Sequence, residues 1–361
     1  MGKSAVKGLF YICLIAATFV LATITIVAAF SGNVAPVDSV IMPLLGLAVP
    51  VLLIVNLITA LCWALARKRW ALVPLVAFFC NWGYLTSVFQ LHLPKDKTPA
   101  GKYLKIATYN IHNFGGEITG YSCKEIARYM QQEGVDVLCF QEFGDNSDFP
   151  TDSIRRVLSH WSHALIPSED SVKGVLPIAV FSRYPLANHR FITYQQSSNC
   201  SMMCDVAMGT DTIRLINNHL QTTSVSQKHR KWERELATDD TRREVQAAKD
   251  AAGTLHENFM KRATQTYVIS HYAKTSPYPV LLCGDFNSIP SSYTYHHLRK
   301  TLKDGFRTAG NGYMYTYRYA KRMLRIDYIF HSPSLKGIAY YSPDLDLCSD
   351  HNPVIMEVEI Q

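Results

Sequence analysis

The sequence lacks any arrangement of cysteines that would cross-link or metallate a small domain. Its nine cysteines include no C-x-x-C pair and no cysteine–histidine cluster with zinc-site spacing, which argues against structural zinc. Cys13, Cys62 and Cys80 lie in apolar runs, where cysteine behaves as a small hydrophobe. Cys200 and Cys204, in NCSMMCD, are the one pair that we expect could form a disulfide in an oxidising compartment.

The chain also lacks internal repeats, low-complexity segments and a strong excess of charge of one sign. The net charge of +7 and the pI of about 8.8 suit a partner that carries phosphate, and they suit anionic lipid equally. Charge alone therefore leaves a nucleic acid and a membrane surface as alternatives. Apolar residues are spread unevenly, and they concentrate in the N-terminal quarter of the chain.

Three long apolar runs lack charged residues in their interiors. Residues 8–31 exceed the roughly 20 residues that a helix needs to span a bilayer. A signal peptide is the competing interpretation, but this run is too long and two more follow, at 40–66 and 70–91. A transport pathway would require ionisable groups inside the runs. We therefore expect residues 1–96 to form a membrane anchor with three transmembrane helices and a polar linker.

Basic residues near the runs predict the orientation of the anchor. Lys3, Lys7 and the turn at residues 67–69 are expected in the cytoplasm, because positive residues favour that side. Three crossings then place the rest of the chain outside it, which suggests a bacterial inner-membrane protein with a periplasmic domain. Polar residues in the third run, Asn81 among them, also permit a re-entrant or interfacial helix.

Residues 97–361 read as one α/β domain. Apolar runs bounded by turn residues predict strands at 103–109, 135–141, 177–182, 212–217, 279–283, 325–330 and 353–359. Helices are expected at 122–132, 151–159, much of 228–272, and 291–301. Polar residues that can bind metals or phosphate recur at the ends of these strands, where α/β proteins commonly place ligands. They are Asn110, Glu142, His219, Asp285 and Asn287.

Three of the polar strand ends suit a metal or a phosphate. In LLCGDFNSIP, Asp285 and Asn287 point to the same side of an extended chain, although Gly-Asp and Asn-Ser are also ordinary turn residues. Glu142 in FQEF is either a ligand for a hard cation or the first exposed residue after its strand. Asn110 in ATYNIHNF is open to the same two interpretations.

Histidines and aspartates complete the set. His219 in INNHLQTTS lies near a strand end, although a single histidine is more often structural. Asp350 and His351 in SDHNPV are adjacent polar groups before the last strand. Asp327 in RIDYIFHS lies in an aromatic strand, where an unpaired charge is costly. A histidine held by that aspartate would be a well-oriented general base.

Together, these six segments resemble the endonuclease/exonuclease/phosphatase family in identity and in order, over about residues 103–361. The resemblance implies a four-layer αββα sandwich of two packed mixed sheets. It also implies hydrolysis of a phosphate ester, most often a diester, by a metal-activated water and a His/Asp general base pair. Mg²⁺ is the expected metal, with Mn²⁺ as a substitute. The alternative is a membrane-tethered module of the same fold that binds a phosphorylated ligand without turnover.

The resemblance also implies roles for single residues. Glu142 is similar to the principal Mg²⁺ ligand, Asn110 to a residue that helps to form the metal site, and Asp350 to the aspartate beside the metal. Hard cations of this kind prefer oxygen ligands.

The remaining residues resemble the groups that act on water and phosphate. Asp285 is similar to the residue that orients or deprotonates the attacking water, and Asn287 to the one that steadies the phosphoryl oxygens. His351 is similar to the general base or phosphate-contacting imidazole, with Asp327 orienting it. His219 resembles the histidine that binds the phosphate from the opposite side.

Two segments have compositions that suit contact with a substrate, but neither identifies the substrate class. Residues 227–246 are dense in charge and read either as a basic arm or as a solvated helix with ion pairs. Residues 312–325 mix tyrosines with arginines, which suits base stacking, a twisted edge strand or lipid headgroups. We expect a nucleic acid or a lipid headgroup as substrate, and the sequence indicates no protein partner.

Overall fold

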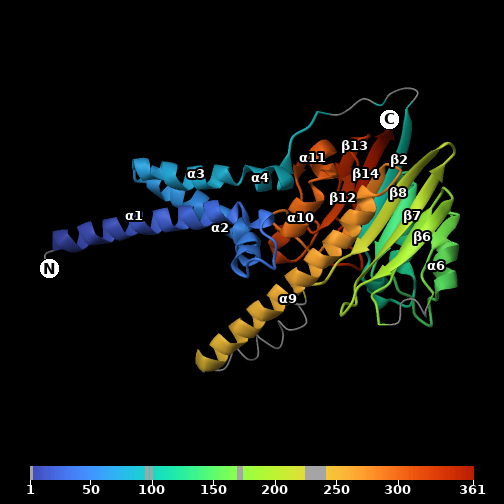
Figure 1. Cartoon of the computed structure of the whole chain (residues 1–361), viewed down its shortest axis with the longest axis horizontal. Coiled ribbons are helices and arrows are strands. Elements are labelled where there is room, and N and C mark those ends of the chain that lie inside the picture. Colours follow the sequence, from blue (N-terminus) through green and yellow to red (C-terminus); the bar gives the residue numbers. More distant parts are fainter. Residues whose placement is uncertain (1–2, 94–96, 98–100, 169–173, 224–240) are drawn as a thin grey trace. The chain divides into compact units, whose positions relative to one another are not determined.

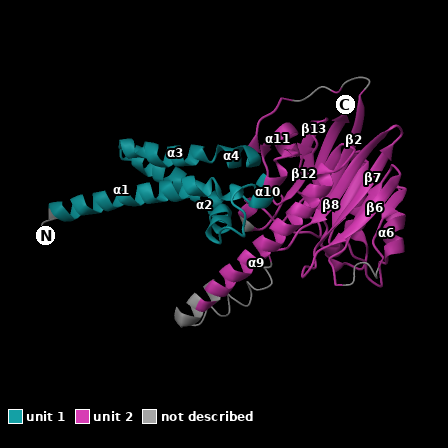
Figure 2. Ribbon diagram, viewed as in Figure 1, with its two compact units in different colours: residues 1–88, 289–296 teal, residues 89–288, 297–361 magenta. Residues whose placement is uncertain are grey.

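The computed structural model describes residues 3–93, 97, 101–168, 174–223 and 241–361. It divides into two compact units, coloured separately in Figure 2. The anchor unit comprises Met1–Val88 and Ile289–His296, and the sandwich unit comprises Phe89–Ser288 and His297–Gln361.

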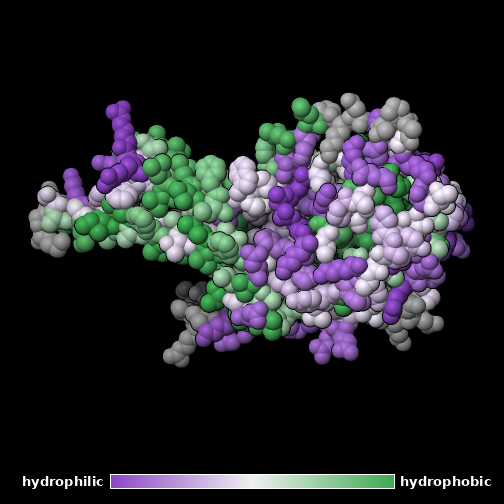
Figure 3. Space-filling model, turned by 45° about the horizontal axis from the view of Figure 1, so that its top comes forward, coloured by the Kyte–Doolittle hydropathy of each residue, from purple (hydrophilic) through white to green (hydrophobic). Residues whose placement is uncertain are grey.

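The anchor unit is helical, and a helix is the form in which a long apolar segment could satisfy its backbone hydrogen bonds internally in lipid. They are α1 (Lys3–Ala28), η1 (Ser31–Asn33), α2 (Ile41–Leu65), η2 (Arg69–Ala71), α3 (Leu72–Cys80) and α4 (Trp82–Val88). Two helices, Ser4–Asn33 and Ile41–Leu65, are each long and apolar enough to cross a membrane. Their outward-facing side chains are largely apolar (Figure 3), as a lipid-facing surface requires.

The third expected span is not one straight helix. Arg69–Cys80 and Trp82–Val88 are bent by 63° relative to each other, so the anchor has three spans only if this pair is counted as one. Asn81 lies at the break, where its Nδ2 donates to the carbonyls of Ala77 and Thr25, 3.1 Å each. Residues 70–91 therefore do not form a third single spanning helix, and three crossings require the bent pair to act as one broken span.

Two mixed six-stranded sheets form the sandwich unit (Figure 1). The first sheet has the order β10-β12-β9-β8-β7-β6, and β8 and β9 are its one parallel pair. Its strands are β6 (Leu186–Thr193), β7 (Cys200–Met208), β8 (Asp211–His219), β9 (Val280–Asp285), β10 (Lys303–Asp304) and β12 (Asp327–His331).

The second sheet has the order β13-β14-β2-β3-β5-β4, and β2 and β3 are its parallel pair. Its strands are β2 (Lys102–Asn110), β3 (Val137–Gln141), β4 (His163–Leu165), β5 (Ile178–Ser182), β13 (Leu335–Tyr341) and β14 (Val354–Ile360). A separate two-stranded ladder joins β1 (Phe89–Gln90) to β11 (Gly312–Tyr313).

Apolar side chains from both sheets meet between them and form the main core. Its fully buried members include Ile106, Val137, Cys139, Val180, Leu215, Leu281, Cys283 and Ile329. On the outer face of the second sheet, α5 (Tyr121–Gln132) and α6 (Thr151–Val157) cover a second core that contains Met130, Phe140 and Ile154. The buried Gln265 of α9 (Thr241–Lys274) binds the backbone that follows β8. These helices and sheets confirm the four-layer αββα sandwich.

The expected elements agree with the structure in kind. All seven predicted strands are present, and the helices predicted at 122–132, 151–159 and 291–301 correspond to α5, α6 and α10 (Tyr293–Leu298). The long predicted helix is α9, and the part of that prediction before residue 241 lies outside the described residues. Short helical segments complete the fold: η3 (His112–Gly116), α11 (Gly305–Ala309) and η4 (Ala320–Arg322).

The disulfide that the sequence left open between Cys200 and Cys204 does not form. Both residues lie in β7, four positions apart, and both are free and buried. A strand rises about 3.3 Å per residue, which places their Cα atoms roughly 13 Å apart, well beyond the reach of a disulfide.

Candidate active site

The register of the strands brings the expected polar residues to one edge of the sandwich. In the first sheet His219 pairs with Asp285 across β8 and β9, and Asp327 pairs with Asp285 across β12 and β9. In the second sheet Asn110 ends β2, and Glu142 directly follows the last residue of β3. Side chains from two sheets therefore meet where the parallel strands end.

Asn110 joins the two sheets at this edge. Its Nδ2 lies 3.1 Å from Glu142 Oε1 and 3.1 Å from Asp285 Oδ2. The second oxygen of Glu142 lies 3.2 Å from Nδ1 of His112, which the sequence analysis did not single out. Glu142 and Asp285 thus face each other across a single amide nitrogen.

The turn after β9 holds Asp285 and Asn287 in a fixed relation. The backbone N–H of Asn287 donates to Asp285 Oδ1 at 2.8 Å, and its Nδ2 lies 3.2 Å from Asp285 Oδ2 and 3.1 Å from the Leu220 carbonyl. Asn287 and Glu142 both have positive φ, of 47° and 48°. Non-glycine residues adopt this conformation at some cost, and such residues cluster at functional sites.

His219 is fully buried and faces both carboxylates. Its Nε2 lies 3.6 Å from Glu142 Oε1 and 3.7 Å from Asp285 Oδ2, beyond ordinary hydrogen-bond distance. Among the residues that the structure describes, neither ring nitrogen of His219 has a hydrogen-bond partner. Burial lowers the pKa of His219, although the two carboxylates raise it. A buried polar group of this kind indicates that a ligand or water completes the site.

His351 and Asp327 form a buried pair. Nδ1 of His351 lies 2.9 Å from Asp327 Oδ2 and 3.1 Å from Oδ1, while Nε2 points toward Asp285 Oδ2 at 3.7 Å. Burial lowers the pKa of His351, but the carboxylates of Asp327 and Asp285 raise it further, to about 10. Burial raises the pKa of Asp327 to about 6, against the opposing effect of His351. Near neutral pH the pair is therefore imidazolium and carboxylate.

Two further residues, Thr316 and Ser349, hold this pair in place. The Thr316 hydroxyl accepts from the backbone N–H of Asp327 at 3.0 Å. The Ser349 hydroxyl donates to the Asn110 carbonyl at 2.6 Å and accepts from the His351 N–H at 3.0 Å. These serine and threonine contacts could not be predicted from the sequence, because such residues are common in loops. Their role becomes visible only when their hydrogen-bond partners in the folded structure are known.

Tyr317, in the tyrosine-rich segment 312–325, is another residue whose contact with the site was not predicted from the sequence. Its ring packs edge-to-face against the ring of His351, with centroids 5.3 Å apart. Burial raises the pKa of Tyr317 to about 12, and the charge of Asp350 adds to the shift. Asp350 Oδ1 lies 3.9 Å from His351 Nε2. With Asp350, all eight residues that the sequence predicted for the site lie at the same edge of the sandwich.

The donor set fits a hard divalent cation. The most compact group of metal-capable atoms in the described part of the chain is Asp285, Asp327 and His351, whose atoms lie within 4.8 Å of one another. Asp327 and His351 bind each other, however, so Asp285 and the nearby Glu142 are the carboxylates that remain for a metal. Two facing carboxylates supply the oxygen ligands that Mg²⁺ prefers, and the buried His219 imidazole faces both of them.

The tyrosine- and arginine-rich segment 312–325 contributes less to the site than its composition suggests. Arg325 is fully buried and bonds Asp304 at 2.6 and 2.8 Å, so it is a structural cation. Arg318 pairs with Asp344 and Asp346 on the surface. Most of the charged segment 227–246 lies outside the described residues.

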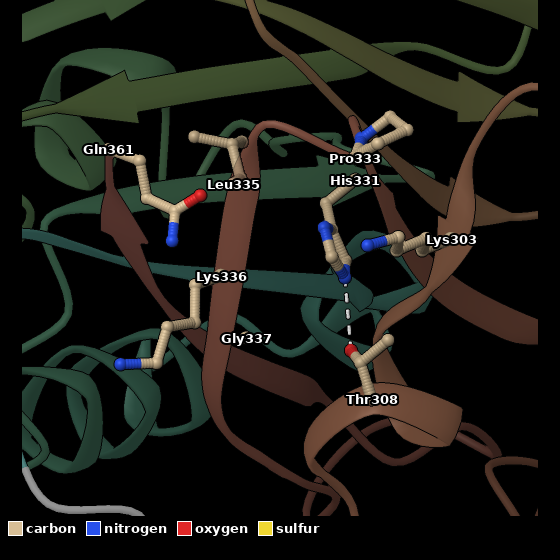
Figure 4. A pocket seen from close by; sticks show the side chains of 8 residues that line it. All are labelled: Lys303, Thr308, His331, Pro333, Leu335, Lys336, Gly337 and Gln361. Atoms are coloured by element: carbon tan, nitrogen blue, oxygen red, sulfur yellow. Dashed lines mark hydrogen bonds between the residues drawn. The ribbon is translucent and has the colours of Figure 1, made fainter.

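A separate pocket lies at the opposite end of β12. Its volume is about 320 Å³, and Figure 4 shows the residues that line it: Lys303, Thr308, His331, Pro333, Leu335, Lys336, Gly337 and Gln361. His331 ends β12, whereas Asp327 begins it, and the lining contains none of the eight expected residues. This pocket is therefore distinct from the candidate active site.

Comparisons with known proteins agree with the geometry. The model described as the Endonuclease/Exonuclease/phosphatase family matches residues 107–351, and a Domain of unknown function (DUF8431) matches residues 9–88. No curated protein matches the chain.

Solved structures of similar fold cover the sandwich unit. An endonuclease/exonuclease/phosphatase from Beutenbergia cavernae DSM 12333 is 17% identical, with a TM-score of 0.52 and 72% of each chain covered. One from Bacteroides vulgatus is 16% identical, with a TM-score of 0.52, and 72% of this chain and 100% of that chain are covered. One from Bacteroides thetaiotaomicron is 16% identical, with a TM-score of 0.50 and coverage of 72% and 99%. At such identities the likeness shows the fold.

Proposed function

Because the chain belongs to the endonuclease/exonuclease/phosphatase family, we propose that it is a membrane-anchored, Mg²⁺-dependent hydrolase of phosphate esters. The observation that carries this proposal is the convergence of Asn110, Glu142 and Asp285 with His219 and the His351–Asp327 pair. A structural role does not call for two carboxylates and two imidazoles at one strand edge. A phosphate centre does, because it needs a metal ligand set, a water-orienting group and donors to the phosphoryl oxygens.

Glu142 and Asp285 would hold the metal, with Asp350 at its margin and Asn110 keeping the two carboxylates apart. When bound, Mg²⁺ supplies a Lewis acid that polarises a phosphoryl oxygen and favours ionisation of a bound water. Asn110 donates to both carboxylates at 3.1 Å, so it fixes their separation before any ligand arrives. Such preorganisation lowers the cost of reorganising the site during the reaction.

Asp285 and Asn287 act on the attacking water and the phosphate. The buried Asp285 carboxylate accepts the Asn287 N–H through Oδ1 and the Asn110 amide through Oδ2, and between these fixed contacts it would orient a water and accept its proton. The Asn287 amide, next to it, can donate to a phosphoryl oxygen. Because the turn already fixes both groups, the water and the phosphate would meet in a defined geometry.

His351 is best suited to donate a hydrogen bond or a proton. Its raised pKa keeps the ring protonated near neutral pH, so Nε2–H can stabilise negative charge on a phosphoryl oxygen or on the leaving group. Of the two roles that the resemblance implied for His351, this is the phosphate-contacting imidazole, and Asp285 is then the group that deprotonates the water. His219, whose pKa burial lowers, provides a neutral imidazole on the other side of the phosphate.

The substrate class follows from the anchor. An enzyme tied to a membrane meets lipid headgroups and molecules at that surface at high local concentration. We therefore favour a phosphodiester of a lipid headgroup or of an extracytoplasmic nucleic acid, hydrolysed on the periplasmic side of a bacterial inner membrane. The basic turn at residues 67–69 supports that orientation.

The full-length chain in lipid nanodiscs tests the proposal. Wild type and His351→Ala are incubated with and without Mg²⁺ on duplex DNA, RNA, sphingomyelin, glycerophospholipid and inositol phosphates. We expect Mg²⁺-dependent cleavage of one class, lowered by about 10²–10⁴-fold in the variant because a positioned proton donor is lost. A folded protein that binds a phosphorylated ligand but cleaves none of these esters would instead be a binding module.

A further inference from the structure

The segment directly after the Asp285–Asn287 turn belongs to the anchor unit. Ile289–His296 is far from the anchor helices in sequence, yet it forms one compact unit with Met1–Val88 (Figure 2). Ile289 is 6% exposed, Ser291 5% and Tyr295 1%. The polar residues among these are buried with hydrogen-bond partners rather than left in solvent, so the segment is built into the anchor.

Ser291 joins the segment to both sides of the α1–α2 connection. Its carbonyl accepts from the Ser31 hydroxyl at 3.0 Å, and its own hydroxyl donates to the Gly46 carbonyl at 2.7 Å. Gly46 allows this close approach, because a Cβ there would lie 2.8 Å from Ser31 Oγ and 3.2 Å from the Ser291 carbonyl oxygen. The residue at position 46 therefore has to be small for the contact to form.

Tyr295 and His296 bind two further parts of the anchor. The Tyr295 hydroxyl donates to Ser87 Oγ of α4 at 2.8 Å, and both side chains are buried. The His296 ring lies 3.3 Å from Asn33 Oδ1 and packs over Gly32, where a Cβ would lie 2.5 Å from the ring. The segment thus has partners in η1, α2 and α4, so its position depends on the fold of the anchor as a whole.

The covalent link to the active site is short. Ile289 follows Asn287 by two residues, so the chain between them spans at most about 7 Å. Asn287 also has a φ of 47°, a conformation that its surroundings must maintain. We propose, on the basis of the proposed function, that the anchor is a positioning device: by binding Ile289–His296 it holds the Asp285–Asn287 turn in its active geometry. Ser87, Ser291 and Tyr295 are then positioning residues, and the membrane part is required for full turnover.

A double-mutant cycle on the full-length chain in nanodiscs tests this proposal. Ser87→Ala, Tyr295→Phe and the double variant all remove the same buried hydrogen bond. We expect each single variant to lower kcat about tenfold with KM unchanged, because a small displacement of a catalytic group is costly. The double variant should be no slower than either single variant, since both lose one shared contact. Hydrogen exchange of the peptide covering residues 281–292 should become faster in all three.

Matched controls separate positioning from general damage. Thr59→Ala removes an exposed hydroxyl that donates to the Val55 carbonyl within α2, and Tyr278→Phe removes a tyrosine hydroxyl before β9, at the end of that strand opposite Asp285. Both controls should keep wild-type kcat and exchange, and the kcat losses of Ser87→Ala and Tyr295→Phe should persist at temperatures well below the unfolding transition of every variant.

The outcomes for the two proposals are distinct. An active wild type whose kcat and exchange are unaffected by Ser87→Ala and Tyr295→Phe would overturn the positioning proposal and leave the proposed function standing. A wild type with no turnover on any phosphate ester would overturn the proposed function. In that case hydrogen exchange alone would test the positioning proposal. Faster exchange at residues 281–292 in the Ser87→Ala and Tyr295→Phe variants supports docking of the segment by the anchor, and unchanged exchange rejects it.

Discussion

At the scale of single residues, electrostatics distinguishes the two histidines of the site. His351 and His219 both face Asp285, but only His351 has a second carboxylate, Asp327, within hydrogen-bond distance. The pKa of His351 is therefore raised, and that of His219 is lowered by burial. One imidazole is a proton donor near neutral pH, and the other is neutral.

This difference predicts the pH dependence of hydrolysis. The protonated form of His351 is active in our account, so turnover should persist through neutral pH and fall as pH rises through about 10. Asp327→Asn removes the largest raising contribution, so the alkaline limb of the kcat profile should move to lower pH. Initial rates measured from pH 6 to 11 for both proteins test this. An alkaline limb that stays in place in Asp327→Asn would show that another group titrates.

Sequence analysis located the groups that carry charge, because carboxylates and imidazoles after apolar strands are conspicuous. It did not locate Thr316, Ser349 or Tyr317, which orient these groups through backbone contacts and ring packing. The raised pKa of His351 could not be read from the sequence, because it depends on the short distance to Asp327, which begins β12 of the first sheet while His351 precedes β14 of the second.

At the scale of elements, the packing of β9 against β8 determines where the last residue of β9, Asp285, lies. Gly284 has a φ of 132°, and a Cβ there would lie 1.9 Å from the Asn218 carbonyl oxygen of β8. Only glycine allows this approach in the residue before Asp285. The long strands were predictable because their residues are strongly apolar, and the same apolar character buries them in the core. β7 was missed, because serine, methionine and cysteine give little strand signal even though all of CSMMCDV is buried.

Substitutions at two glycines separate crowding from backbone strain. Gly284→Ala should lower the free energy of unfolding by about 3 kcal/mol or more, because the methyl group displaces β8. Gly209→Ala, at a φ of 71° with nothing within 4 Å of the added Cβ, should cost only about 1 kcal/mol. Thermal unfolding of the full-length chain should show drops in Tm of roughly 6–12 °C and 2–4 °C. Equal drops would contradict the steric argument.

At the scale of the whole molecule, the bent third segment decides on which side of the membrane the site lies. Two single helices return the chain to its starting side, whereas a third crossing by Arg69–Val88 moves it across. Hydropathy gave the apolar content of this segment but not its shape, because the bend depends on Asn81 binding the Thr25 carbonyl of another helix.

Reporter fusions test the proposed orientation. Alkaline phosphatase, active only outside the cytoplasm, is fused after Lys68 and after Gln361. We expect activity from the fusion after Gln361 and none from the fusion after Lys68, because the basic turn remains cytoplasmic. Activity from neither fusion would mean that the third segment re-enters without crossing, and that the site faces the cytoplasm.

Restoration of activity by metal tests the central claim most directly. The full-length chain is stripped of divalent cations, and phosphodiester hydrolysis is measured as Mg²⁺ or Mn²⁺ is added back to wild type, to Glu142→Gln and to the control Glu125→Gln, whose carboxylate pairs with Arg128 in α5. Our account predicts that wild type and Glu125→Gln regain activity with either metal, whereas Glu142→Gln needs roughly 10–100 times more metal or stays inactive, since a ligand charge is lost. Full hydrolysis by the stripped wild type, or equal metal dependence of Glu142→Gln and wild type, would contradict it.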